Sequence, residues 1–353
     1  MLKDEYSPFK MVHHQGHLAD MKKDMQVVPL QVQLIPSNAC NQRCVFCTYR
    51  MKDYACNQMF DEKVMLPHEK VLECIDDFAD MGVKAVQFTG GGEPLTHPNI
   101  REQFEYTLSK DLQLSLVSNG MALTDVLCRI LSQASWSRIS MDSATPKTYA
   151  QERSVSPKVF HRTVLNIEKL VHYNQGAVLG IGFVVTKGNY KEIYQAAKLA
   201  KELGVNNFRI SGAFTNDGYS YFDGFREEAW EQARKATELT DRHFTVFNLF
   251  NERMNDLFEG KQEYMFCPMK ELLTYVGADF NVYTCCTLAY NTKGLIGSIK
   301  EQSFRELWEG PKKRKMFRNH NPRKLCQQQC LYRGKNEFIN YCLNHNPSHI
   351  DYI

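Results

Sequence analysis

Short apolar runs alternate with longer amphipathic stretches along roughly the first two thirds of the chain. Apolar runs of four to eight residues predict strands, and they cover residues 31–35, 85–89, 112–117, 137–141, 178–185 and 207–210. The stretches between them place apolar residues three or four positions apart, which predicts helices over 67–81, 98–110, 124–133, 157–175 and 193–203. This alternation is typical of right-handed βαβ units and indicates an α/β fold around a parallel sheet.

Unusual residues directly follow several of these predicted strands. In parallel α/β folds the loops after the strands lie on one face and carry the chemistry. Three closely spaced cysteines come after the first strand, and a glycine-rich turn ending in Glu93 and Pro94 comes after the second. Later strands are followed by Ser118-Asn119-Gly120, by Ser140 and Asp142, and by Thr186. We therefore expect these residues to converge at one face of a curled sheet.

The regular alternation of predicted strands and helices ends after about residue 224. We expect a polar N-terminal extension over 1–30, a sheet-forming core over 31–224, a charged helical linker over 225–265 and a small α+β region over 266–353. The last region is rich in turns and holds six of the twelve cysteines, so we expect its core to contain metal as well as hydrocarbon. The sequence thus predicts two folded parts of unequal size.

Composition and charge exclude several classes of protein. The chain has 43 basic and 40 acidic side chains, and this net charge of +3 is too balanced to indicate a nucleic-acid or membrane partner. No apolar run approaches the roughly 18 residues of a membrane helix, and the N-terminus has no hydrophobic signal core. These features predict a cytoplasmic protein with reduced thiols, in which clustered cysteines indicate metal or redox chemistry rather than disulfides.

Three of the cysteines, Cys40, Cys44 and Cys47, form the pattern C-x3-C-x2-C. Thiolates are the usual ligands of iron–sulfur clusters, and three of them would leave one iron of a four-iron cubane open. About fifty residues later, the glycines at 90–92 let the backbone approach a ligand closely, and Glu93 would hold an ammonium group by its charge. The pattern therefore predicts a ligand that is cationic at one end and chelates the open iron. A zinc site or a purely structural site is the alternative.

Residues 31 to about 211 resemble the core of the radical S-adenosylmethionine (radical SAM) superfamily. The signature of that family is the cysteine pattern with an aromatic residue, here Phe46, before the last cysteine. Gly91-Gly92-Glu93-Pro94 is similar to the turn that binds the amino group of S-adenosylmethionine, and Gly180-Ile181-Gly182 is a looser match to a motif of the fifth strand. The resemblance implies a partial (β/α)6 TIM barrel, with S-adenosylmethionine contacts from Phe46, Gly91, Gly92, Glu93, Ser140 and Arg153.

The same resemblance implies the chemistry of the first cysteine group. A [4Fe–4S] cluster held by Cys40, Cys44 and Cys47 takes up one electron from a reductant such as flavodoxin or ferredoxin and passes it to S-adenosylmethionine. The carbon–sulfur bond then breaks, and a 5′-deoxyadenosyl radical abstracts a hydrogen atom from the substrate.

The C-terminal cysteines follow the pattern C-x17-C, a gap, then C-x3-C, and comprise Cys267, Cys285, Cys326 and Cys330. They resemble the twitch domain, a shortened SPASM domain, which implies that these four thiolates hold one auxiliary [4Fe–4S] cluster. The family usually ends in C-x2-C, so Cys286 is an alternative to Cys285, and Cys342 is an alternative to Cys326 or Cys330. A set of buried structural thiols without metal is the remaining alternative.

We expect an enzyme that abstracts a hydrogen atom from a small polar metabolite, such as a sugar, an aminocyclitol or a nucleoside derivative. The twitch-like arrangement resembles radical dehydrogenases that act on aminocyclitols, which implies an oxidation in which the auxiliary cluster accepts the electron left on the substrate. The candidate substrate contacts lie on or after the sixth strand, and they are Arg209, Asp217, Tyr219, Tyr221 and Asp223.

Two alternatives for the function remain open. The first is SPASM-type modification of a peptide or protein side chain. Against it, only about thirty residues precede the first strand, too few for the peptide-binding domain of many such enzymes. The second is a non-catalytic iron–sulfur electron-transfer or sensor protein, which would need a fourth cysteine near Cys47. Cys56, Cys74 and Cys128 are expected to be ordinary thiols.

Overall fold

The predicted strands form one curved sheet in a computed structural model of the chain. The structure describes residues 7–23, 26–54, 57–252, 262–326 and 330–344. The strands that match the predicted apolar runs are β1 (Gln31–Leu34), β2 (Ala85–Phe88), β3 (Gln113–Ser118), β4 (Trp136–Ser140), β5 (Val178–Val185) and β6 (Asn207–Gly212). The prediction of an α/β fold is confirmed.

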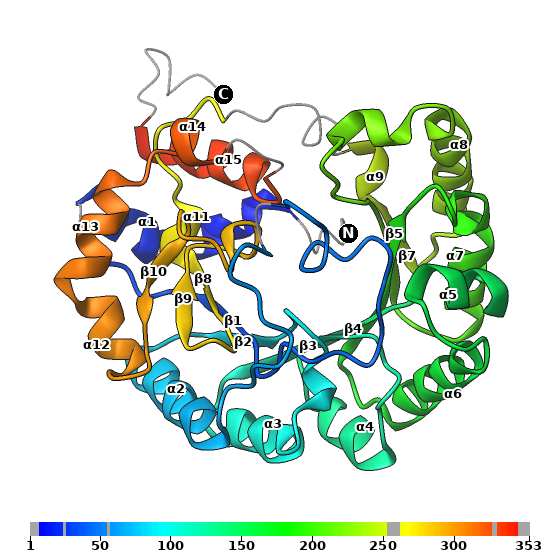
Figure 1. Cartoon of the computed structure of the whole chain (residues 1–353), viewed down its shortest axis with the longest axis horizontal. Coiled ribbons are helices and arrows are strands. Elements are labelled where there is room, and N and C mark those ends of the chain that lie inside the picture. The colour runs from blue at the N-terminus through cyan, green and yellow to red at the C-terminus, as the bar shows by residue number, and fades with distance from the viewer. Residues whose placement is uncertain (1–6, 24–25, 55–56, 253–261, 327–329, 345–353) are drawn as a thin grey trace.

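In the described part of the chain the sheet has ten strands, in the order β10-β9-β8-β1-β2-β3-β4-β5-β6-β7. The further strands are β7 (Thr245–Asn248), β8 (Leu273–Val276), β9 (Asn281–Tyr283) and β10 (Leu295–Ser298). All neighbours from β8 to β7 are parallel, whereas β9 and β10 add antiparallel strands at one edge. Figure 1 shows the strong curvature of this sheet, with helices on its convex side. Because β7 and β10 are the two ends of the order, the described strands make an open, partial barrel.

The strands β7 and β8 extend the sheet beyond the six strands that the sequence predicts. β7 lies in segment 225–265, which was expected to be a helical linker, and pairs in parallel with β6. β8 belongs to the cysteine-rich C-terminal region and pairs with β1, so that Gln31 lies opposite Leu273 and Leu34 opposite Val276. The C-terminal region is therefore continuous with the sheet, and it covers an edge of β1 that would otherwise expose unpaired backbone groups.

Helices cover the convex face of the sheet (Figure 1) and are α2 (His68–Met81), α3 (Ile100–Ser109), α4 (Asp125–Leu131), α6 (Lys158–Tyr173), α7 (Ile193–Glu202) and α8 (Arg226–Thr237). Their ends carry the expected capping residues. The Thr124 hydroxyl accepts from the N–H of Leu127 at the start of α4, and Gly82 ends α2 with a φ of 89°. The sequence pattern does not predict α5 (Pro146–Arg153), because this short helix is largely polar and lacks an apolar stripe.

Shorter elements complete the described chain. They are η1 (Pro8–His13), α1 (Gln15–Lys22), η3 (Pro94–Thr96), η4 (Tyr190–Glu192), η5 (Gly218–Phe222), α9 (Leu249–Glu252), α11 (Met269–Leu272), η6 (Cys286–Leu288), α12 (Phe304–Glu309), α13 (Pro311–Asn319), α14 (Pro322–Leu325) and α15 (Arg333–Asn344). The predicted N-terminal extension thus contains η1 and α1, and its Met11 packs with Leu272 and Ile339 in a small separate core. Among the described helices, none has both the length and the apolar character needed to cross a membrane.

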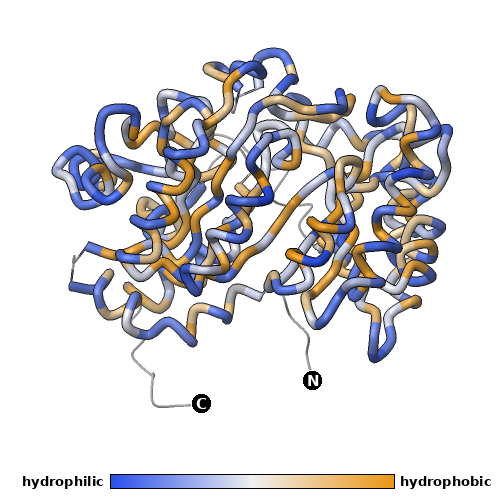
Figure 2. Tube along the Cα trace, turned by 90° about the horizontal axis from the view of Figure 1, so that it is seen from below, coloured by the Kyte–Doolittle hydropathy of each residue, from blue (hydrophilic) through white to orange (hydrophobic). Residues whose placement is uncertain are grey.

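Successive residues of each parallel strand point to opposite faces of the sheet. Val32, Leu34 and Phe88 are fully buried in the core shared with the helices, whereas their neighbours Gln31 and Gln33 are only partly buried. Figure 2 shows the result over the whole trace, in which hydrophobic residues lie mostly inside and hydrophilic residues mostly at the periphery. The convex face therefore supplies the hydrophobic core, and the concave face is left for polar side chains.

Candidate functional site

The loop after β1 carries Cys40, Cys44 and Cys47, all partly buried. The N–H of Arg43 donates to the carbonyl of Arg153 at 3.0 Å, which fixes the loop against the end of α5. Burial raises the pKa of Cys44 to about 11, and the charges of Cys40 and Cys47 also raise it. All three thiols belong to this one loop of eight residues, which follows the carboxyl end of β1. Metal binding would remove their protons.

The glycine turn packs directly against the start of this cysteine loop. The N–H of Gly92 donates to the carbonyl of Ser37 at 3.1 Å, and the N–H of Glu93 donates to the carbonyl of Ala39 at 2.8 Å. A Cβ atom on Gly92 would lie 2.1 Å from the Ala39 carbonyl oxygen, so no other residue fits there without moving the loop. The glycines that the sequence singles out are therefore required by close backbone packing of the two loops.

Glu93 is buried, and both of its carboxylate oxygens accept hydrogen bonds from the protein. One oxygen accepts from the Ser118 hydroxyl at 2.6 Å and from the N–H of Leu95 at 3.1 Å, and the other accepts from the N–H of Asn119 at 2.7 Å. Burial raises the pKa of Glu93, and these donors lower it. The carboxylate thus ties the glycine turn to the end of β3, and a contact with a ligand ammonium would come in addition.

Arg153 joins the end of α5 to the cysteine loop and to β4. Its guanidinium is buried, forms an ion pair with Asp142, and donates from Nη1 to Gln42 Oε1 at 2.8 Å. The same Nη1 lies 3.6 Å from Cys44 Sγ. Asp142 adopts a φ of 58° just beyond β4, and its carboxylate also accepts from the N–H of Val184 at 2.7 Å. Arg153 therefore places a positive charge beside a cysteine that would carry a negative one.

Ser140 and Phe46, the other expected S-adenosylmethionine contacts, lie around the same end of the sheet. Ser140 is partly buried at the last position of β4, opposite Gly182 of β5. Phe46 is partly buried within the cysteine loop, between Cys44 and Cys47. The buried hydroxyl of Thr186, after β5, donates to Glu152 Oε2 at 2.9 Å and so serves the protein scaffold.

Sequence reasoning missed two polar links in this site. The amide of Gln42 donates to the Tyr149 hydroxyl at 3.0 Å, and the amide of Asn119 donates to Asn41 Oδ1 at 2.7 Å. Gln42 and Asn41 lie inside the cysteine motif, at positions where the motif specifies no residue type. Their partners come from α5 and from the loop after β3, so no local pattern in the sequence could have identified them.

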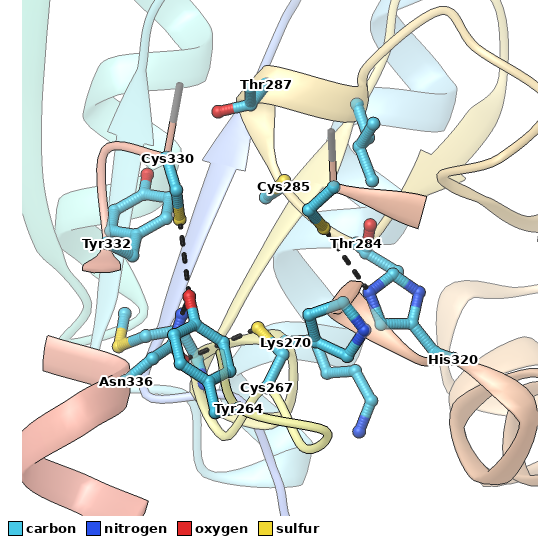
Figure 3. Close-up of a pocket in the computed structure, with 14 residues that line it drawn as sticks. Tyr264, Cys267, Lys270, Thr284, Cys285, Thr287, His320, Cys330, Tyr332 and Asn336 are labelled. Atoms are coloured by element: carbon cyan, nitrogen blue, oxygen red, sulfur yellow. Dashed lines mark hydrogen bonds between the residues drawn. The ribbon is translucent and has the colours of Figure 1, made fainter. Parts of the chain in front are cut away.

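The second cysteine group lines one cavity, which Figure 3 shows. Cys267, Cys285, Cys326 and Cys330 all line this cavity, as the resemblance implies. The pKa of Cys285 is raised well above its usual value by burial and by the charges of neighbouring cysteines, the other three among them. Partly buried thiols gathered around one cavity fit a [4Fe–4S] cluster, because a cubane takes one thiolate at each iron.

The alternatives Cys286 and Cys342 do not line the cavity. The Cys286 thiol lies 3.5 Å from the Tyr332 hydroxyl and packs beside the aromatic residues of the sheet edge. Cys342 is partly buried on α15. Cys74 and Cys128 are buried in the hydrophobic core, which fits ordinary thiols, and Cys56 lies outside the described residues.

Over the part of the chain that the structure describes, no three His, Cys, Asp or Glu side chains are spaced to hold a single metal ion. A cubane does not require such convergence, because its irons occupy separate corners and each takes its own thiolate.

Polar and ionisable groups surround the cavity thiols (Figure 3). The Tyr264 hydroxyl lies 3.7 Å from Cys330 Sγ, and the Cys267 thiol donates to Asn336 Oδ1 at 3.4 Å. Burial lowers the pKa of His320 to about 4, and the charge of Lys270 adds to this effect. The cavity therefore presents polar groups close to its sulfur atoms.

Comparisons with known proteins agree with this geometry. The radical SAM superfamily matches residues 34–237, more than half of the chain, and an iron–sulfur cluster-binding domain of the SPASM type matches residues 267–331. An AdoMet-dependent heme synthase from Methanosarcina barkeri is 31% identical over 173 residues, which are 48% of this chain and 47% of that protein. An S-adenosylmethionine-dependent nucleotide dehydratase from Flammeovirga pacifica is 31% identical over 163 residues, 43% of this chain and 52% of that protein. The chain thus spans about half the length of these curated relatives.

Solved structures share the fold at low sequence identity. Streptococcus suis SuiB bound to S-adenosylmethionine superposes with a TM-score of 0.63 at 16% identity, over 88% of this chain and 74% of that chain. The structure of native anSMEcpe with bound AdoMet gives a TM-score of 0.59 at 18% identity, over 82% of this chain and 83% of that chain. These likenesses support an open parallel α/β fold. The enzymes among the relatives also argue against a non-catalytic electron carrier. The chain belongs to the radical SAM superfamily, and it is an enzyme that binds S-adenosylmethionine, a SAM-binding [4Fe–4S] cluster and an auxiliary [4Fe–4S] cluster in a SPASM-type region.

Proposed function

We propose that this enzyme abstracts a hydrogen atom from a small polar metabolite and oxidises it, most simply by dehydrogenation. When bound, S-adenosylmethionine and its cluster supply a 5′-deoxyadenosyl radical that removes the hydrogen atom. The auxiliary cluster would supply the acceptor for the electron left on the substrate radical, and the substrate would also release a proton to solvent, which completes the dehydrogenation. The observation that carries the proposal is the polar character of the concave face of the sheet.

The concave positions of four strands carry polar side chains. The Gln31 amide on β1 donates to Gln87 Oε1 on β2 at 2.7 Å, and Arg138 and Arg209 occupy β4 and β6. Between these arginines runs β5, in which Gly180 lies opposite Arg138 and Gly182 lies opposite Arg209. Polar groups on this face favour a polar substrate, because a hydrophobic substrate would leave them buried without hydrogen bonds.

The two glycines of β5 make room for the long side chains of the neighbouring strands. A Cβ atom on Gly182 would lie 3.3 Å from Arg138 Cδ, and a Cβ on Gly180 would lie 2.3 Å from Asn207 Oδ1. Arg138 therefore reaches across the concave face of β5 toward the strand that carries Arg209. Guanidinium groups in such a place suit a substrate with a carboxylate, a phosphate or several hydroxyl acceptors.

The proposed roles of the cluster ligands follow from the geometry of the two sites. Cys40, Cys44 and Cys47 hold the SAM-binding cluster, with the cysteine loop fixed by the glycine turn and by Arg153. The auxiliary cluster is held by Cys267, Cys285, Cys326 and Cys330, the four thiols that line the cavity. We assign these ligands to two parts of the chain, a radical SAM core over 31–224 and an auxiliary region over 266–353, which are joined through 225–265.

The proposed S-adenosylmethionine contacts are residues at the same end of the sheet: Phe46, Gly91, Gly92, Glu93, Ser140 and Arg153. Gly91 and Gly92 offer backbone carbonyls, Glu93 adds negative charge toward the ammonium group, and Ser140 offers a hydroxyl at the end of β4. Arg153 orients Cys44 and holds Asp142. These residues bind and orient the cofactor and keep water away from it, which is the contribution that a protein makes to cofactor chemistry.

A small polar substrate also agrees with the activities for which several relatives are named. GTP 3′,8-cyclase from Aquifex aeolicus, 30% identical over 185 residues, and the nucleotide dehydratase both act on nucleotides by name. The alternative substrate is a peptide or protein side chain. The SuiB structure with its precursor peptide shows that a related fold accommodates a peptide, although at 16% identity the likeness concerns the fold alone.

The test is an anaerobic assay of the reconstituted enzyme with S-adenosylmethionine, a chemical reductant and pools of polar metabolites. We expect 5′-deoxyadenosine to form faster with one class of phosphorylated, carboxylated or polyhydroxylated metabolite, together with a product two mass units lighter. The variant Cys44→Ala should form no 5′-deoxyadenosine, whereas Cys74→Ala, which changes a core thiol, should remain active. If peptides stimulate the formation of 5′-deoxyadenosine and none of the metabolites does, the proposal is overturned in favour of the peptide alternative.

A further inference from the structure

The strongest unassigned feature of the auxiliary cavity is His320. This histidine follows α13, and its N–H donates to the Phe317 carbonyl at 3.3 Å. Its side chain lines the cavity together with the four cysteines (Figure 3), and the residue is 5% exposed. The short helix α14 separates His320 from Cys326, and the Asn321 side chain caps that helix by accepting from the N–H of Arg323 at 3.0 Å. The local fold thus presents the imidazole to one particular thiol.

The two ring nitrogens of His320 lie in different surroundings. Nε2 lies 4.0 Å from Cys326 Sγ. Nδ1 is buried and has no hydrogen-bond partner among the described residues. A buried polar atom without a partner costs free energy, so a structural role alone explains this histidine poorly. The bond from Nε2 becomes stronger when Cys326 is a thiolate, because a hydrogen bond to a charged acceptor is stronger than one to a neutral acceptor.

A second side chain of the cavity, Tyr264, faces a different thiol, that of Cys330. Asn336 donates from Nδ2 to the Tyr264 hydroxyl at 3.0 Å, which leaves the Tyr264 proton to point at Cys330 Sγ, 3.7 Å away. Asn336 Oδ1 is an acceptor for Met269 N–H and for the Cys267 thiol, so it offers no proton to a thiolate at Cys267. Side-chain donors therefore face Cys326 and Cys330.

We propose that His320 donates a hydrogen bond from Nε2–H to the thiolate of Cys326 on the auxiliary cluster and thereby raises the reduction potential of that cluster. The proposal rests on the ligand set proposed above. Reduction adds negative charge to the cluster and its thiolates, and an N–H donor stabilises the reduced state more than the oxidised state. A higher potential makes the auxiliary cluster a better acceptor for the electron left on an oxidised substrate. His320 is thus a positioning residue for the ligand rather than a ligand itself.

The test is a potentiometric titration followed by electron paramagnetic resonance, without S-adenosylmethionine or substrate. The full chain carries Cys40→Ala, Cys44→Ala and Cys47→Ala, so that the auxiliary cluster alone, with about four irons per chain, gives the signal. Into this background we place His320→Phe, which removes the donor, and His320→Gln, which retains an N–H. The control is His172→Phe, which changes an exposed histidine on α6.

We expect His320→Phe to shift the midpoint potential to a more negative value with the iron content unchanged, and His320→Gln to recover part of the shift. Tyr264→Phe, which removes the donor to Cys330, should shift the potential in the same direction. A midpoint for His320→Phe equal to that of His172→Phe would overturn the proposal. Loss of iron in both His320 variants would also overturn it, because that result would make His320 a ligand. Since no substrate is used, failure to find a small polar substrate leaves this result unaffected.

Discussion

The Tyr290 hydroxyl, in the auxiliary region, donates a hydrogen bond to Oδ1 of Asn38, two residues before Cys40, the first cysteine of the loop after β1. The same hydroxyl would lie 3.0 Å from a Cβ atom on Gly91, so it also bounds the glycine turn. Tyr290 belongs to a buried aromatic group in which the Tyr49 and Tyr275 hydroxyls lie 3.1 Å apart. The auxiliary region therefore packs against the segment before Cys40 and against the glycine turn, which we propose to bind S-adenosylmethionine.

The first prediction concerns this link. Tyr290→Phe leaves the buried Asn38 Oδ1 without its donor, so we expect the free energy of unfolding to fall by about 1–3 kcal/mol. We also expect weaker binding of S-adenosylmethionine, because the Asn38 segment and the glycine turn lose their common support. Urea unfolding and equilibrium dialysis with S-adenosylmethionine measure the two effects. Tyr341→Phe, at an exposed position on α15, is the control, and equal behaviour of the two variants would contradict the role of the link.

A second prediction follows from the packing of the glycine turn. Gly92→Ala places a Cβ atom 2.1 Å from the Ala39 carbonyl oxygen and must displace the loop just before Cys40. Because a misplacement of about 1 Å at a reacting centre costs roughly 100-fold in rate, we expect a loss of this order in 5′-deoxyadenosine formation. The control is Gly16→Ala, since a Cβ there meets no atom within 4 Å. Full activity of Gly92→Ala would show that the cysteine loop tolerates the shift.

The third prediction tests which thiols hold the auxiliary cluster. Cys330→Ala should lose about half of the iron of the reconstituted enzyme, because one of two four-iron clusters loses a ligand. Cys342→Ala should keep all of it, since Cys342 lies outside the cavity. Iron and sulfide analysis measures both, and the same chemistry predicts that a chelator strips the metal faster from Cys330→Ala. Loss of iron in Cys342→Ala alone would show that Cys342, and not Cys330, is a ligand of the auxiliary cluster.

The fourth prediction addresses the substrate. Arg138 is partly buried on the concave face and lies over the Trp136 ring, with 5.6 Å between the guanidinium carbon and the ring centroid. Arg138→Met removes a charged donor, so we expect the KM of the substrate to rise by about tenfold or more. The matched control is Arg129→Met, because Arg129 also lies over an aromatic ring, that of Tyr173, but on the outer helix α4. An unchanged KM in Arg138→Met would show that this arginine does not bind the substrate.

Much of the scaffold could be predicted from local patterns. The run at 178–185 forms β5 over those same residues, and Thr124 caps α4, because strand burial and helix capping depend on residues close together in the chain. The cysteine motif and the glycine turn were also recognisable, since each is short and contiguous. Strands β7 and β8 were not predicted as parts of the sheet, because their apolar runs are short and their partners lie far away in the sequence.

By itself the sequence determined the alternation of strands and helices, the placement of the cysteines and glycines after strands, and the family. Only the tertiary structure decided which distant groups meet: Tyr290 at Asn38, Arg153 beside Cys44, and His320 at Cys326. The physical reason is the range of each interaction. Capping and amphipathic periodicity act within a few residues along the chain, whereas a buried hydrogen bond selects any donor that the packing of the sheet brings within reach.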